Sequence, residues 1–256
     1  LRRGLFLSVI LSAGTVIGTF SRSGFLGLGV SVLVFIMFQR RRAAALLALT
    51  SILVLAYFFM PVPEGYIDRV RTISTYEEAN ESSALSRFHF WKVAMNIAAA
   101  NPLGIGLRQF EAIYNDYDFS GGLYGPGRSV HSSHFQMLAE LGYPGAVIWV
   151  FLFLYSMIIG LKIRSRSRHA ALPQDVSLFM ITYANAILAS MAGFVVGGAF
   201  IALAINDITW YTFALLAALD RISSQQLAEA LDNEKKTIGN GGLNRFAVGG
   251  RVTVRS

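Results

Sequence analysis

The chain has no cysteine and little charge. None of its 256 residues is cysteine and only 14% are charged, whereas a soluble domain carries roughly a quarter charged residues. The lack of cysteine excludes disulfides, thiolate metal sites and a cysteine nucleophile. With 54% hydrophobic residues and a mean hydropathy of +0.51, the composition indicates an integral membrane protein.

The net charge is +7, which in a soluble protein would favour nucleic acid as a partner. In a membrane protein it more often reflects the charge of cytoplasmic loops, and no nucleic-acid-binding motif is present. We therefore expect membrane lipids as partners and no nucleic acid. The chain begins with Leu1 and shows no signal-peptide cleavage site, which indicates a fragment that lacks upstream sequence.

Six apolar segments are candidates for membrane-spanning helices, which need about 20 apolar residues each. The last of them is the weakest, because it is short and follows a polar turn. These segments predict an all-α, polytopic helical bundle. They are Gly4–Phe20, Gly24–Phe38, Ala43–Met60, Pro144–Leu161, Val176–Phe200 and Ile208–Ala218.

The basic clusters fall on one side of the membrane if six spans alternate, and that side should be the cytoplasm. Residues 61–143 then form a large extracytoplasmic loop, with nine Asp/Glu against six Lys/Arg. Three spans in residues 1–60 precede this loop, three in 144–220 follow it, and 221–256 form a partly disordered cytoplasmic tail. The clusters are Arg2–Arg3, Arg40–Arg42, Lys162–Arg168 and the tail after Arg221.

The loop shows internal organisation. Thr72–Ser83 is polar and turn-like, whereas Ser86–Ala100 has helical spacing of apolar residues and ends before a proline. Asp116–Ser129 is rich in glycine and predicted to be irregular. His131–Leu141 predicts a second helix, with Gly142 at its C-terminal cap.

Two further expectations concern the segments after the loop. Gly193 and Gly197 form a small-xxx-small pattern, which is typical of close helix packing in the fifth span. The tail from Gln225 predicts a short helix followed by disorder.

Two arginines stand in unusual places. Arg22 lies between two apolar segments, where a charged side chain should snorkel to lipid head groups or clamp an anion in a wet cavity. Arg87 lies one helical turn from Trp91, so it either stacks on the tryptophan or provides a second phosphate ligand. Asp116 and Asp118 fit no strong metal motif, so no metal site is predicted.

His131 and His134 are three residues apart and would share a helix face. They could form a metal pair, but no acidic motif accompanies them; they could be structural; or either could act as a general base. Four further side chains of the loop could line the same mouth: Arg108, Tyr117, Tyr124 and Arg128.

Several of these motifs, read together and in order, resemble the O-antigen ligase and polymerase superfamily. The resemblance covers about Gly4 to Ala218, and its histidine segment looks most like the exosortase-associated branch of probable O-glycosylation ligases. Two residues depart from the family pattern: Ser132 replaces a common asparagine, and His134 replaces an aromatic residue. The motifs are Ser21–Gly24, Arg87 with Trp91, Asn101–Gly106 with Phe110, His131–Gln136 and Glu140–Gly142.

The resemblance implies a GT-C-like membrane glycosyltransferase in the bacterial inner membrane, with its catalytic loop in the periplasm and no cofactor. The donor would be a glycan on undecaprenyl diphosphate, and the acceptor lipid A–core, a protein or another glycan. Arg22 and Arg87 would hold the diphosphate, and His131 would activate the acceptor hydroxyl. The substrate-binding residues would include His134, Trp91, Arg108, Arg128 and Tyr124.

Three alternatives remain open on the residues. A polymerase of the same superfamily would transfer to a lipid-linked glycan. A polysaccharide transporter would use the arginines to guide an anionic substrate, although transporters place such residues near the bilayer midplane. A serine protease would use Ser23, Ser132 or Ser133 with a histidine, but no nucleophile motif supports it.

Overall fold

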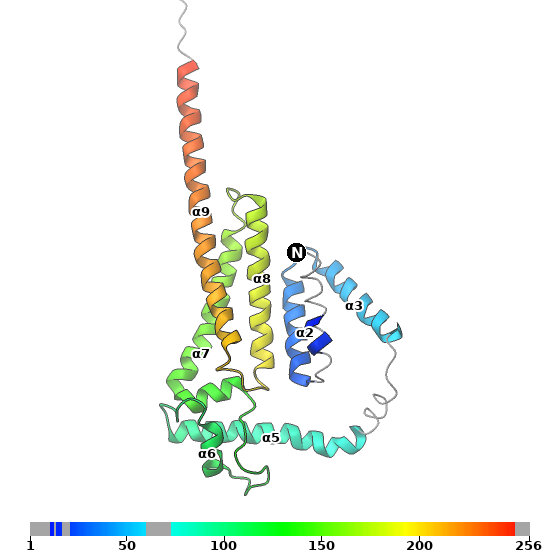
Figure 1. Cartoon of the computed structure of the whole chain (residues 1–256). Coiled ribbons are helices and arrows are strands. Elements are labelled where there is room, and N and C mark those ends of the chain that lie inside the picture. Colours follow the sequence, from blue (N-terminus) through cyan, green and yellow to red (C-terminus); the bar gives the residue numbers. More distant parts are fainter. Residues whose placement is uncertain (1–10, 13, 17–20, 60–72, 249–256) are drawn as a thin grey trace, which may run out of the picture. The chain divides into compact units, whose positions relative to one another are not determined.

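The computed structural model describes residues 11–12, 14–16, 21–59 and 73–248. Across these ranges the regular secondary structure is helical and includes no strand (Figure 1). The prediction of an all-α protein is therefore confirmed. Of the first predicted span, Gly4–Phe20, residues 11–12 and 14–16 lie within the described ranges and are helical, and the rest lies outside them.

Two helices are long and apolar enough to cross a membrane, α7 and α8. Helix α7 contains the predicted span Pro144–Leu161. Helix α8 contains the predicted fifth span from Val176 as far as Gly197 and ends three residues before its predicted limit at Phe200. Shorter apolar stretches lie in α2 and at the start of α3. The helices of the described residues are α2 (Arg22–Met37), α3 (Arg42–Phe59), α5 (Ile73–Ala100), α6 (Phe110–Tyr117), α7 (Ser133–Arg166), α8 (Gln174–Gly197) and α9 (Asp207–Val248).

The start of α5 corrects one expectation. The prediction that Thr72–Ser83 is turn-like was wrong, because the helix already begins at Ile73. That stretch is polar, but no glycine or proline interrupts α5 and its glutamates and alanines are good helix formers. The helix ends at Ala100, as predicted, and the Asn101 side chain donates a hydrogen bond to the Ile97 carbonyl at 3.1 Å.

The end of α9 corrects another expectation. The helix runs unbroken from Asp207 to Val248, well past Ala218, where the predicted sixth span ends. The segment after Asp220 is rich in leucine, alanine, glutamate, glutamine and lysine, which all favour helix. The short tail helix predicted from Gln225 is therefore the continuation of α9.

The chain divides into two compact units, which we describe separately. The first comprises residues 1–154 and 188–211, and the second comprises 155–187 and 212–256. In the second unit, an ion pair joins Arg166 to Asp220 at 2.5 Å, and the Ser177 hydroxyl donates to the Ser167 carbonyl. Every candidate site residue named above lies in the first unit.

Within the first unit, α2 and α8 approach closely through glycines. A Cβ atom added to Gly193 would lie 2.6 Å from the Gly27 carbonyl oxygen and 1.9 Å from the Ser31 hydroxyl oxygen. Gly197 is also close, since its added Cβ would meet the Gly27 Cα at 3.5 Å. The close packing predicted from the small-xxx-small pattern is thus confirmed.

A break in α7 lets the turn after α5 pack closely on this helix. Gly142 is non-helical, with φ 66° and ψ −166°, and divides the helix where the sequence predicted a cap. The turn after α5 packs on this break: Gly106 donates its N–H to the Glu140 carbonyl at 2.9 Å, and Tyr143 donates to the Pro102 carbonyl at 3.0 Å. A Cβ atom on Gly142 would lie 2.2 Å from that Pro102 oxygen.

We predict that Gly142→Ala destabilises the protein by more than about 2 kcal/mol, because the new methyl group meets backbone atoms and a positive φ disfavours alanine. Thermal unfolding in detergent would measure the effect. Gly29→Ala is the matched control, since its added Cβ has no neighbour within 4 Å and alanine favours a helix. Equal melting temperatures for the two variants would contradict the prediction.

Candidate functional site

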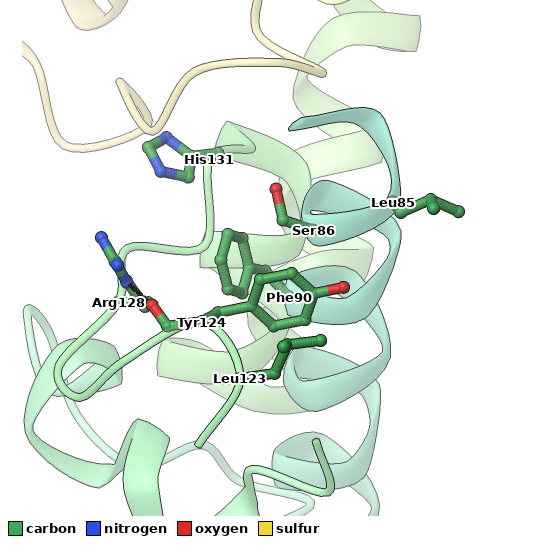
Figure 2. Close-up of a pocket in the computed structure, with 7 residues that line it drawn as sticks. All are labelled: Leu85, Ser86, Phe90, Leu123, Tyr124, Arg128 and His131. Atoms are coloured by element: carbon green, nitrogen blue, oxygen red, sulfur yellow. Dashed lines mark hydrogen bonds between the residues drawn. The ribbon is translucent and has the colours of Figure 1, made fainter. Parts of the chain in front are cut away.

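A cavity of about 540 Å³ lies between α5 and the irregular segment that precedes α7. In Figure 2, Arg128 and His131 extend from this segment, which faces α5 across the cavity. Three of the predicted site residues, Tyr124, Arg128 and His131, therefore share one cavity. The lining residues are Leu85, Ser86, Phe90, Leu123, Tyr124, Arg128 and His131.

Phe90, which lines the cavity, belongs to a buried apolar cluster that α5 and α6 form together. Helix α6 was not predicted, because eight residues are a short signal. Its buried side chains Phe110 and Tyr114 pack with Phe90 of α5 and Val130 of the irregular segment. This packing places the segment that carries Arg128 and His131 over α5.

His131 has an unusual backbone conformation. Its φ is 47°, a left-handed value that non-glycine residues seldom adopt. Ser133, two residues later and fully buried, anchors the strained turn to the chain after α8. The Ser133 N–H donates to the Gly198 carbonyl at 2.7 Å, its hydroxyl donates to the Ile201 carbonyl at 2.7 Å, and the Leu203 N–H donates to that hydroxyl at 2.9 Å.

The same bonds bear on the serine-protease alternative. Ser133 is held by backbone partners on both sides of its hydroxyl. Ser132 is also buried, with 1% of its surface exposed, and its hydroxyl accepts from the Phe135 N–H at 3.4 Å. Both serines are parts of the α7 N-terminus, which argues against a nucleophile at either position.

The electrostatic surroundings keep His131 neutral. Partial burial lowers the pKa of His131, the positive charges of Arg87 and Arg128 lower this pKa further, and the negative charge of Glu111 opposes them. Near neutral pH the imidazole therefore carries a free lone pair. A neutral imidazole at the mouth of a cavity can accept a proton from a hydroxyl group.

Arg87 and Trp91 lie beside this cavity and do not line it. The Arg87 guanidinium lies 5.8 Å from the centre of the Phe200 ring, in a cation–π contact. The Trp91 ring stacks on Phe135 at 5.2 Å and lies 6.1 Å from Phe200. These contacts place Trp91 in an aromatic cluster with Phe135 and Phe200, while the positive charge of Arg87 lowers the pKa of His131.

Arg22 is the first residue of α2, and its side chain lies outside the described part of the structure. Ser21 caps this helix by accepting the Gly24 N–H at 3.2 Å. A Cβ atom on Gly197 would lie 3.4 Å from the Ser23 carbonyl oxygen, and the next residue, Gly198, accepts the Ser133 bond. The N-terminus of α2 thus lies at the same end of this unit as the His131 turn.

His134 occupies a different environment from His131. The Trp149 indole N–H donates to His134 Nδ1 at 3.0 Å, and His134 Nε2 lies 2.8 Å from the Val195 carbonyl oxygen. Since Nδ1 accepts this bond, Nε2 carries the ring hydrogen and donates a hydrogen bond to the Val195 carbonyl. Both ring nitrogens are engaged within the protein, so of the two histidines only His131 presents its imidazole to the cavity.

His89 is a buried residue that the sequence analysis missed. Its Nε2 lies 2.8 Å from a carboxylate oxygen of Asp118 and 3.3 Å from the Tyr114 hydroxyl. The Ser120 hydroxyl, two backbone N–H groups and His89 lower the pKa of Asp118 to about 2. No sequence signal links two residues so far apart in the chain.

The His89–Asp118 pair holds the glycine-rich segment against α5. Asp118 accepts the N–H groups of Ser120 and Gly122, each at 2.9 Å. The His89 ring lies 4.9 Å from the ring of Tyr124, which lines the cavity. The pair therefore positions the segment that carries Tyr124 and Arg128.

Within the described ranges, no group of three or more His, Asp or Glu side chains is arranged to hold a metal ion. Arg108 lines a second, smaller cavity of about 260 Å³ together with Glu111, Gln136 and Glu140. Thus the structure groups Tyr124, Arg128 and His131 in one cavity and places Arg108 in another.

We predict that His89→Phe loosens the glycine-rich segment, because phenylalanine keeps the ring contacts but leaves the buried Asp118 carboxylate without its imidazole partner. Trypsin should then cleave after Arg128 at least about threefold faster than in the unmodified protein. His169→Phe, at an exposed turn of the second unit, is the matched control. An unchanged cleavage rate in His89→Phe would refute the positioning role.

The comparisons with known proteins give one family match. The model of the O-antigen ligase family matches residues 7–150, which include the His131 turn, Arg87 and the break in α7. No curated protein matches the chain significantly. Because the family match covers more than half of the chain and all of the cavity, this protein belongs to the O-antigen ligase family.

Proposed function

We propose that the protein is a membrane glycosyltransferase that moves a glycan from undecaprenyl diphosphate to an acceptor hydroxyl. Membership of the O-antigen ligase family supports a glycosyl-transferring membrane enzyme. The observation that carries the proposal is the neutral imidazole of His131 in one cavity with Arg128 and within the field of Arg87.

The proposed reaction is a single displacement at the anomeric carbon. His131 takes the proton of the acceptor hydroxyl as the hydroxyl oxygen attacks that carbon. The bond between the anomeric carbon and the diphosphate oxygen breaks, and undecaprenyl diphosphate leaves with the electron pair. Inversion at the anomeric carbon is the expected stereochemical result.

Arginines would stabilise the charge that develops on the leaving diphosphate. The positive charges of Arg87 and Arg128 act on His131. Arg22 is the first residue of α2, whose N-terminus lies at the same end of the unit as the His131 turn. Guanidinium groups stay charged and match phosphate oxygens with paired N–H donors. Placed in advance, such cations lower the barrier without reorganisation during the reaction.

The apolar side of the cavity suits the rest of the leaving group. Leu85, Phe90 and Leu123 give the cavity an apolar part, whereas Arg128 and His131 give it a basic part. A prenyl diphosphate has a charged head joined directly to an apolar chain. This division of the lining therefore favours a lipid-linked donor over a water-soluble nucleotide sugar.

The proposed location is the bacterial inner membrane, with the His131 cavity facing the periplasm and α7 and α8 crossing the bilayer. The proposed acceptor is lipid A–core or a protein hydroxyl. A single addition to one acceptor would identify a ligase, whereas a ladder of products would identify the polymerase alternative.

We predict that His131→Ala lowers transfer by at least about a hundredfold, because the attacking hydroxyl loses its base. Transfer from an undecaprenyl-diphosphate-linked glycan by purified protein would measure it, with the melting temperature as a check on folding. His169→Ala is the matched control and should keep full activity. Full activity in His131→Ala would overturn the mechanism.

The charges around His131 predict opposite pH shifts for two variants. Arg87→Gln removes a cation and should raise the pKa of His131, so the rise of kcat/KM with pH moves to higher pH. Glu111→Gln removes an anion and should lower this pKa, so the rise moves to lower pH. Profiles that do not move, or that move in the same direction, would contradict the role of His131 as the base.

A further inference from the structure

A second cavity of about 260 Å³ adjoins the first. One short segment separates the two, since Arg128 and His131 line the larger cavity while Ser129 and Val130 line the smaller one. The charge of Glu111, which lines the smaller cavity, also acts on His131. The two cavities are therefore close enough to hold two parts of one reacting assembly.

Glu140 lines the smaller cavity and is held in place by several hydrogen bonds. Its side chain is buried, with 3% of its surface exposed. The carboxylate accepts the backbone N–H groups of Arg108 and Phe110 and the Gln136 Nε2 at 3.4 Å. These bonds hold Arg108 at its left-handed φ of 60° and fix the start of α6.

Gln136 supplies an unused hydrogen-bond acceptor. The Glu140 carboxylate accepts from the Gln136 amide nitrogen at 3.4 Å, so the amide oxygen Oε1 takes no part in this bond. This oxygen is buried and has no hydrogen-bond partner among the residues that the structure describes. Leaving a buried carbonyl unsatisfied costs about 1–3 kcal/mol, a penalty that a ligand hydroxyl would remove.

The other polar groups of the cavity add both donors and acceptors. Arg108 donates, Glu111 accepts and the Ser129 hydroxyl can do either. The two glutamates disfavour an anionic ligand, and Arg108 disfavours a cationic one. The cavity is smaller than the roughly 300–1,000 Å³ of sites for larger ligands, so it suits a neutral group of about one ring.

We propose that this cavity is the subsite for one neutral, hydroxyl-bearing sugar ring at the reacting centre. Gln136 Oε1 would accept a ring hydroxyl, Arg108 and Ser129 would contact its neighbours, and Glu140 would keep this frame rigid. The inference rests on the proposed function, in which the larger cavity holds the prenyl diphosphate. The ring belongs either to the donor glycan or to the acceptor.

The test measures binding to the purified full chain in detergent. The probes are farnesyl diphosphate, farnesyl diphosphate bearing one hexose, and methyl glycosides of glucose, galactose, mannose and N-acetylglucosamine. Gln136→Leu removes the amide and keeps an apolar side chain that reaches the δ position, and it should weaken sugar binding about tenfold. Gln109→Leu, an exposed position outside both cavities, is the matched control and should bind normally.

The probes separate the two sources of the ring. If the donor sugar occupies the cavity, Gln136→Leu weakens binding of the hexosyl farnesyl diphosphate and leaves farnesyl diphosphate unaffected. If the acceptor sugar occupies it, Gln136→Leu weakens binding of a methyl glycoside. Ser129→Ala keeps the hydrogen bonds of Glu140 and should weaken binding of the same probe about threefold. A loss of binding in this variant too would show that the effect of Gln136→Leu does not come from misfolding.

Two results would overturn the proposal: equal sugar binding by the unmodified protein, Gln136→Leu and Ser129→Ala, or no sugar binding by the unmodified protein. Failure of the proposed function has a different signature, namely no binding of farnesyl diphosphate to the unmodified protein. The two failures are therefore read from different probes.

Discussion

The three hydrogen bonds of Ser133 organise the candidate site. They tie the start of α7 to the chain after α8 through the Gly198 carbonyl, the Ile201 carbonyl and the Leu203 N–H. This anchoring fixes the strained turn of His131. The same stretch after α8 carries Phe200, which contacts Arg87 and Trp91 of α5, so one short segment joins α5, α7 and α8 within this unit.

The second constraint is the absence of side chains at the break in α7. Gly142 and Gly104 let the turn after α5 approach the end of the first part of α7, where an added Cβ atom would overlap backbone atoms. This approach lets the Glu140 carboxylate accept the backbone N–H groups of Arg108 and Phe110. As a result, the segment from Arg128 to His131 runs between two cavities of opposite character, one mainly apolar and one mainly polar.

Charge placement links the two proposed roles of the arginines. The cations suited to a leaving diphosphate also lower the pKa of His131, so a single arrangement would both stabilise the leaving group and keep the base unprotonated. The buried His89–Asp118 pair contributes to this arrangement, because it holds Tyr124 and the glycine-rich segment against α5.

The sequence by itself determined the helical class, the apolar segments of α7 and α8, the cap at Gly142 and the glycine contact of α8, because each depends on residues close together in the chain. It misjudged the start of α5, where polarity concealed helix propensity, and missed the short helix α6. The tertiary structure alone separated His131 from His134, since Trp149 and the Val195 carbonyl occupy the nitrogens of His134. It alone paired His89 with Asp118 and left Gln136 Oε1 unpartnered among the described residues, because such pairings depend on distances between segments that local patterns do not encode.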